Sequence, residues 1–177
     1  MWCFSSDESR RWTDARYYGE RKFAVDESGL PTIIGLEYRV SAPLTGMKWS
    51  QLHWFAGFLA SHLEPFEECL LWVTESGVWP SSENLHLFYR LRESYGEHRP
   101  LADAPGHLFL QHEKADLTTF VAMALLSGWD FYLLPTPIYA AAFVSHDEFA
   151  DLYVSDQETA NQAQKALPGA TLKSEVG

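Results

Sequence analysis

Positive charge is missing from the part of the sequence that is richest in aromatic residues. Between Ala115 and Gln164 the chain has seven carboxylates and eight aromatic side chains, but no lysine or arginine. The whole chain carries a formal net charge of −11. A surface of this sign repels nucleic acids and anionic membranes, and it accelerates encounter with basic proteins. We therefore expect a basic protein as partner, and neither a nucleic acid nor a membrane.

Cysteines and long apolar segments are also scarce. Cys3 and Cys69 are the only cysteines, too few for a disulfide framework, and Cys69 lies in an apolar run typical of a buried thiol. No window approaches the roughly eighteen uninterrupted apolar residues of a membrane span. The first twenty residues are dense in charge and lack the apolar stretch of a secretory signal. These features predict a cytoplasmic protein.

Familiar catalytic and cofactor motifs are missing as well. The sequence contains no His-Glu-x-x-His, no Cys-x-x-Cys, no Gly-x-Ser-x-Gly and no glycine-rich phosphate loop with its lysine. We predict no cofactor and no metal, and an enzyme is disfavoured.

The length of 177 residues and the hydrophobic content of 46% fit one folded domain covering 1–177. Residues 1–30 are interpreted as a polar N-terminal arm, in which Arg10, Arg11 and Arg16 stand beside aromatic residues. On a basic protein this pattern would suggest nucleic-acid contact. On so acidic a chain, we expect it to pair with the acidic body.

Hydrophobic periodicity predicts an α/β or α+β fold. We expect a mixed sheet of four to five strands, three to four packed helices, and a hairpin near the C-terminal side. Residues 97–111 contain two prolines and are predicted to form a surface connection. The strands are expected at 32–40, 68–75 (the central strand), 129–134, 138–144 and 151–154, and the helices at 48–63, 81–95, 113–127 and 157–167.

The loop after the central strand is the first candidate site, because ligands of open α/β sheets often bind beyond strand ends and helix N-termini attract anions. It offers Glu75, Trp79, Ser81 and Ser82. The structural alternative is that Ser81 caps the next helix while Trp79 shapes a turn.

The second candidate is the turn formed by residues 145–148. It places His146 beside Asp147 and Glu148, which could bind a metal or act in acid–base chemistry if His107, His112 or Glu113 joined them. The alternative is a solvated polar turn. Because acids and aromatics concentrate in this region without bases, we predict a partner-binding surface made of Asp130, Tyr132, Tyr139, His146, Asp147, Glu148 and Asp151.

Three segments, 72–84, 128–134 and 145–149, resemble a family of small bacterial proteins without assigned activity, and through them immunity proteins of polymorphic toxin systems. The resemblance covers roughly residues 65–155 and carries over no catalytic residue. It implies an inhibitor that binds a cognate toxin, often a basic nuclease, with carboxylates where phosphates would sit. Two alternatives stay open: a small-ligand protein or hydrolase using the loop after the central strand, and a structural homo-oligomer whose aromatics form the subunit interface.

Overall fold

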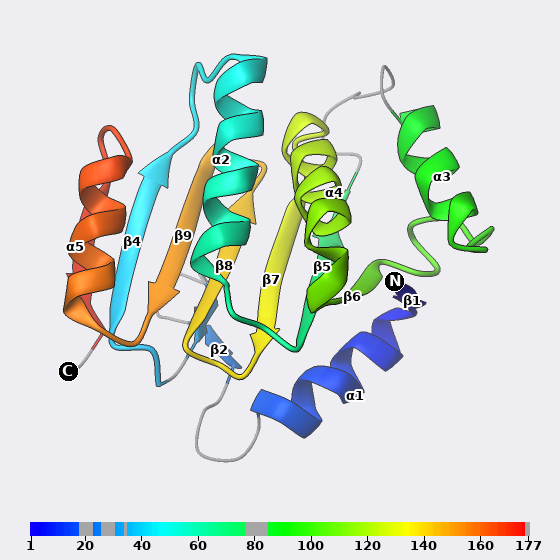
Figure 1. Cartoon of the computed structure of the whole chain (residues 1–177), viewed down its shortest axis with the longest axis horizontal. Helices are drawn as coiled ribbons and strands as arrows, with labels where there is room; N and C mark the ends of the chain where they lie inside the picture. Colours follow the sequence, from blue (N-terminus) through cyan, green and yellow to red (C-terminus); the bar gives the residue numbers. More distant parts are fainter. Residues whose placement is uncertain (18–22, 26–30, 34, 77–84, 176–177) are drawn as a thin grey trace.

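The computed structural model describes residues 1–17, 23–25, 31–33, 35–76 and 85–175 (Figure 1). An eight-stranded sheet dominates this part of the chain, and every paired strand in it is antiparallel to its neighbour. Its order is β1 (Trp2–Phe4), β6 (Gly106–Leu110), β5 (Glu68–Glu75), β7 (Asp130–Thr136), β8 (Ala140–Ser145), β9 (Phe149–Val154), β4 (Tyr38–Pro43) and β10 (Thr171–Ser174). A separate pair joins β2 (Phe23–Val25) and β3 (Pro31–Ile33).

Helices cover both faces of the large sheet, because successive side chains of a strand point to opposite faces and the interior strands are apolar on both. On one face lie α2 (Trp49–His62), α4 (Lys114–Leu126) and α5 (Gln157–Ala166), with α3 (Leu85–Ser94) beside them (Figure 1). On the other face, α1 (Ser6–Tyr17) buries Trp12 and Tyr17 against residues such as Leu70 and Leu134.

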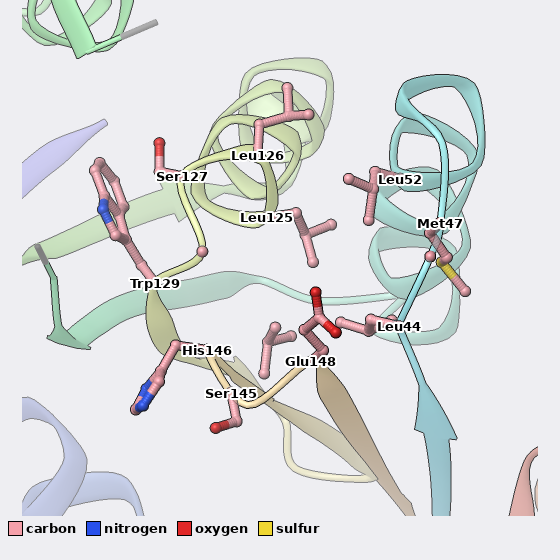
Figure 2. A pocket seen from close by; sticks show the side chains of 13 residues that line it. Leu44, Met47, Leu52, Leu125, Leu126, Ser127, Trp129, Ser145, His146 and Glu148 are labelled. Atoms are coloured by element: carbon pink, nitrogen blue, oxygen red, sulfur yellow. The ribbon is translucent and has the colours of Figure 1, made fainter. Parts of the chain in front are cut away.

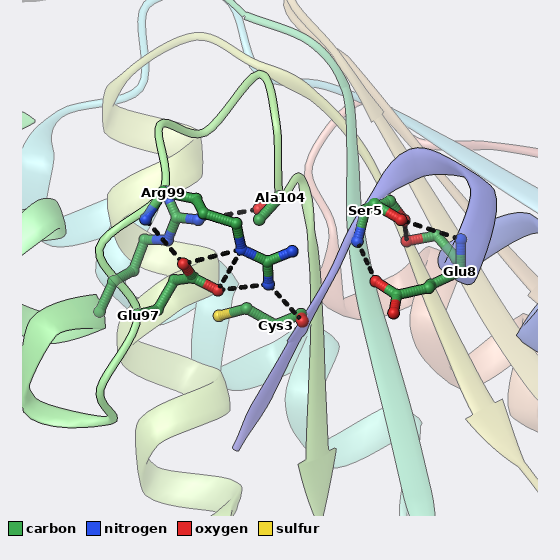
Figure 3. A network of polar contacts seen from close by, with 8 residues as sticks. Cys3, Ser5, Glu8, Glu97, Arg99 and Ala104 are labelled. Carbon is green, nitrogen blue, oxygen red and sulfur yellow. Dashed lines mark hydrogen bonds and ion pairs between the residues drawn. The ribbon is translucent and has the colours of Figure 1, made fainter.

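The N-terminal segment belongs to this fold. β1 pairs with β6, and Arg99 donates a hydrogen bond of 2.9 Å to the carbonyl of Cys3 (Figure 3). The next residues start α1 with reciprocal capping, since the Ser5 amide donates to the Glu8 carboxylate (2.7 Å) and the Glu8 amide donates to the Ser5 hydroxyl (3.2 Å). At the other end of the helix, Arg16 pairs with Glu68 at 2.7 Å. The expected pairing of basic N-terminal residues with the acidic body is therefore present at Arg16.

The predicted sheet of four to five strands with three to four helices is wrong. The described residues form an α+β fold with five α-helices and an eight-stranded antiparallel sheet. The missed strands include β1, β10 and β6, which lies inside the expected surface connection 97–111. β1 and β10 have three and four residues, too few to display an alternating pattern, and they exist because a neighbouring strand supplies their hydrogen bonds.

The segment expected as one strand at 32–40 also divides differently. Its first residues belong to β3 of the small sheet, and β4 begins only at Tyr38. The hairpin of β7 and β8 is present, but it lies in the middle of the large sheet rather than at one side. Within the part of the chain that the structure describes, no helix combines the length and apolar character needed to cross a bilayer.

Candidate functional site

The acid-rich residues gather at one end of the large sheet, where β4, β5 and β8 finish and β7 and β9 begin (Figure 1). Antiparallel pairing brings these positions together: Glu75 is the register partner of Asp130, and Ser145 is the register partner of Phe149. We call this region the acidic end and define it by Glu75, Asp130, His146, Asp147 and Glu148. It unites one residue of the predicted ligand loop with four of the predicted partner surface.

Asp130 and His146 are in direct polar contact at the acidic end. The Asp130 carboxylate accepts a hydrogen bond from the His146 backbone amide at 2.5 Å and lies 2.7 Å from its Nδ1. Asp147 approaches Nε2 at 3.6 Å, with 73% of its own side chain exposed. The hydrogen bond to Asp130, followed by the negative charges of Asp130, Asp147 and Glu75, raises the pKa of His146. The acidic end therefore favours the protonated, cationic imidazole.

The same residues are the described group best placed to hold a metal ion. Ligand atoms of Glu75, Asp130 and His146 all lie within 4.8 Å of one another, and carboxylate and imidazole donors suit several divalent metals. The hydrogen bonds from His146 already account for the position of the Asp130 carboxylate. The group is therefore a possible donor set and gives no independent sign of an ion.

Glu148 lies on the other side of the β8–β9 turn, next to a cavity of about 420 Å³ (Figure 2). Its carboxylate points toward Leu44 and Leu125, whereas the ring of His146 points away from these leucines. The cavity lies between the start of α2, the end of α4 and the β8–β9 turn, and its apolar walls come from Leu44, Met47, Leu52, Leu125, Leu126, Trp129 and Val144. A single carboxylate thus borders a mainly apolar cavity.

An apolar groove adjoins this cavity and shares Leu126 with it. The groove runs between α2, α3 and α4, and two large apolar side chains stand exposed along it, Trp49 at 61% and Leu87 at 50%. Exposed aromatic and aliphatic groups beside a charged rim are the composition of many protein–protein interfaces. His146 and Glu148 of the acidic end therefore line a cavity whose wall at Leu126 also belongs to an apolar groove.

Within the described residues, His146 contacts Asp130 and Asp147, but no lysine or arginine neutralises the carboxylates of the acidic end. Basic side chains pair elsewhere: Arg39 with Glu175 (2.7 Å), Arg99 with Glu97 (2.6 Å) and Lys114 with Glu64 (2.5 Å). Lys48 follows Met47 at the edge of the cavity and is exposed, and among the described residues no lysine or arginine forms an ion pair with Glu75, Asp130, Asp147 or Glu148.

Three residues of the predicted partner surface have other environments. Tyr132 is half-buried, with its ring centroid 4.8 Å from that of Phe143. Tyr139 lies at the opposite end of the β7–β8 hairpin and donates a hydrogen bond of 2.6 Å to the Leu63 carbonyl. Asp151 is 1% exposed and accepts a hydrogen bond from the Ser41 hydroxyl at 2.5 Å, and burial raises its pKa. Tyr139 and Asp151 therefore do not belong to the acidic end.

The other sequence candidates are dispersed. Trp79, Ser81 and Ser82 lie outside the described residues, so of the predicted ligand loop only Glu75 is placed. His107 is buried in β6 between the rings of Phe88 and Phe120. Glu113 pairs with the N-terminal amine. The partners that the turn at residues 145–148 was expected to recruit are absent from it, and Asp130 and Glu75 take their place.

The cavity walls were not identified from the sequence. They come from the β4–α2 connection, the last turn of α4 and the end of β8, and each segment alone shows only ordinary core-forming apolar residues. No local sequence signal indicates that these three segments meet to form a cavity. No protein-family model, no curated protein and no solved structure matches this chain.

Proposed function

We propose that this protein is an acidic binding module that captures a basic protein at the acidic end, in the manner of an immunity protein that neutralises a basic toxin. The observation that carries the proposal is the group of carboxylates from β5, β7 and the β8–β9 turn, which has no lysine or arginine partner among the described residues. Glu148 of this group lines a cavity that shares Leu126 with an exposed apolar groove. Opposite charge steers association, and the apolar groups supply contact area.

Such a module inhibits by occupying the place of an anionic substrate. If the partner is a nuclease, Glu75, Asp147 and Glu148 lie against the basic residues that otherwise bind phosphates. Trp49 and Leu87, exposed in the adjoining groove, then contact the apolar surroundings of the partner's cleft. The exposed carboxylates act mainly on the association rate, because screening by salt is strong outside the contact.

The test uses the protein encoded by the gene immediately next to this one, purified and mixed with the wild type and two double variants. Glu75→Lys with Asp147→Lys reverses two exposed charges of the acidic end. Asp14→Lys with Glu158→Lys makes the same change in net charge at exposed positions of α1 and α5. Association rates are measured from low to high ionic strength.

We expect the wild type to associate more slowly as salt rises, and the first double variant to bind at least tenfold more weakly than the second. A rate that does not change with salt, or equal loss in both variants, contradicts binding at the acidic end. A self-associating chain with no affinity for the neighbouring gene's product supports the homo-oligomer alternative instead.

A further inference from the structure

We infer that the cavity beside Glu148 receives one lysine or arginine side chain of the basic partner, with its aliphatic stem against the apolar walls and its charged end on the Glu148 carboxylate. This inference rests on the proposed function and names the group that is recognised. His146 and Glu148 both line the cavity, but the ring of His146 points away from Leu44 and Leu125 while the carboxylate of Glu148 points toward them, so Glu148 is the group assigned to the charged end (Figure 2).

The walls suit the stem of a long basic side chain. Lysine and arginine bury three or four methylene groups along apolar surface while they keep the charged head in a polar place. Leu44, Leu52 and Leu125 line the cavity with aliphatic groups. The volume of the cavity, about 420 Å³, falls within the range of ligand pockets. Among the described lining residues, His146 and Glu148 are the only two with an acidic or basic side chain.

The backbone holds Glu148 in place from two directions. The Glu148 amide donates to the Ser145 carbonyl at 3.1 Å, which closes the β8–β9 turn, and the Glu148 carbonyl accepts from the Leu44 amide at 2.7 Å. Its φ of 62° lies in the left-handed region, which is unfavourable for a residue with a β-carbon. Ordinary turns place glycine or asparagine there. Here a glutamate occupies the position with its carboxylate directed at the cavity (Figure 2).

The charge of the occupant follows from what Glu148 lacks. Its carboxylate makes no hydrogen bond or ion pair with any other described residue. A neutral apolar occupant would remove water from this carboxylate without replacing the lost interaction, and an anion would be repelled by it and by Asp147. A cation on an apolar stem can pack its stem against the apolar walls and pair its charge with the Glu148 carboxylate. The cavity shares Leu126 with the exposed groove, so a protein chain seated in the groove lies close enough to offer such a side chain.

The experiment titrates the full chain with Nα-acetyl-lysine methylamide and, separately, with the same compound acetylated at Nε, which keeps the stem and loses the charge. Binding is followed by NMR through the methyl groups of Leu44, Leu52 and Leu125. We expect the charged probe to shift these methyls in a saturable way, and the acetylated probe to bind at least about tenfold more weakly.

Glu148→Gln keeps the length of the side chain and removes the charge, and it should reduce affinity for the charged probe at least about tenfold. Glu158→Gln is the matched control, because Glu158 is an exposed glutamate of α5 that does not line the cavity, and it should change affinity less than about twofold. Equal binding of the two probes, or wild-type affinity in Glu148→Gln, overturns the inference. An unchanged backbone amide spectrum shows that Glu148→Gln keeps its fold.

The same variants separate this inference from the proposed function. If Glu148→Gln binds the neighbouring gene's product as tightly as the wild type, while Glu75→Lys with Asp147→Lys does not, the lysine pocket is wrong and the acidic binding module stands. If the charged probe binds at the cavity but no basic protein binds the acidic end, the proposed function is wrong and the cavity binds a free alkylamine. That result also overturns a protein-borne side chain as the occupant.

Discussion

His107 should make the stability of this protein strongly dependent on pH. The imidazole is 0% exposed, and its ring centroid lies 5.6 Å from that of Phe88 and 5.1 Å from that of Phe120. Neither ring nitrogen has a hydrogen-bond partner among the described residues. Burial, and next the positive charge of Arg92, lower the pKa of His107 to about 3, against smaller opposing effects of nearby backbone carbonyls.

The lowered pKa of His107 determines whether the free energy of unfolding rises or falls with pH. An unfolded histidine titrates near 6.5, so between about pH 6.5 and 3 the unfolded chain binds a proton that the folded chain rejects. The stabilisation from a neutral His107 is complete above pH 6.5 and declines as the pH falls toward 3. Each pH unit is equivalent to about 1.4 kcal/mol, which gives a loss of about 2 kcal/mol at pH 5 from this one residue.

The assay is urea denaturation followed by tryptophan fluorescence at pH 7 and pH 5, on the wild type and on His107→Leu. The free energy of unfolding of the wild type should fall by about 2 kcal/mol more than that of the variant. Leu71→Ala is the control, since Leu71 is the register partner of His107 on β5 and is also buried. It should destabilise by about 2–5 kcal/mol, equally at the two pH values. If the wild type and His107→Leu lose the same stability, the imidazole is protonated without unfolding and the reasoning is wrong.

Three further predictions concern the packing of α1, the acidic end and α5. A β-carbon on Gly106 would lie 2.2 Å from the Ser9 hydroxyl oxygen, so Gly106→Ala should cost about 1–3 kcal/mol in urea denaturation, and adding Ser9→Ala should restore part of it. Asp130→Asn should lower the pKa of His146 in an NMR titration, and an unchanged pKa would show that Asp130 does not stabilise the imidazolium. Asp156→Ala should cost about 0.5–2 kcal/mol, because the carboxylate caps α5, and loss of stability without loss of helix content in α5 would point to another cause.

The helices α2, α4 and α5 and the strand β5 could be predicted from the sequence because their patterns are local and long. β5 was expected at 68–75 from an unbroken apolar run, and it is an interior strand covered on both faces. α1 was also readable, since Ser5 and Glu8 have the spacing of a capping box, yet its dense charge made it resemble a polar arm. Local patterns thus determine the elements that are long enough to display a period.

Contacts between strands that are distant in sequence determine which side chains meet. Glu75 and Asp130 are 55 positions apart and become register partners because β5 pairs with β7, a pairing that depends on two faces packed by α1, α2 and α4. Tyr139 and Asp151 were grouped with the turn at residues 145–148 from their nearness in sequence, but extended strands carry them to the far end of the sheet and into its buried face. Composition and local patterns establish an acidic, aromatic-rich chain in which the long helices and β5 can be recognised. The sheet determined where the acids stand, because each strand's neighbours are set by contacts between residues distant in sequence.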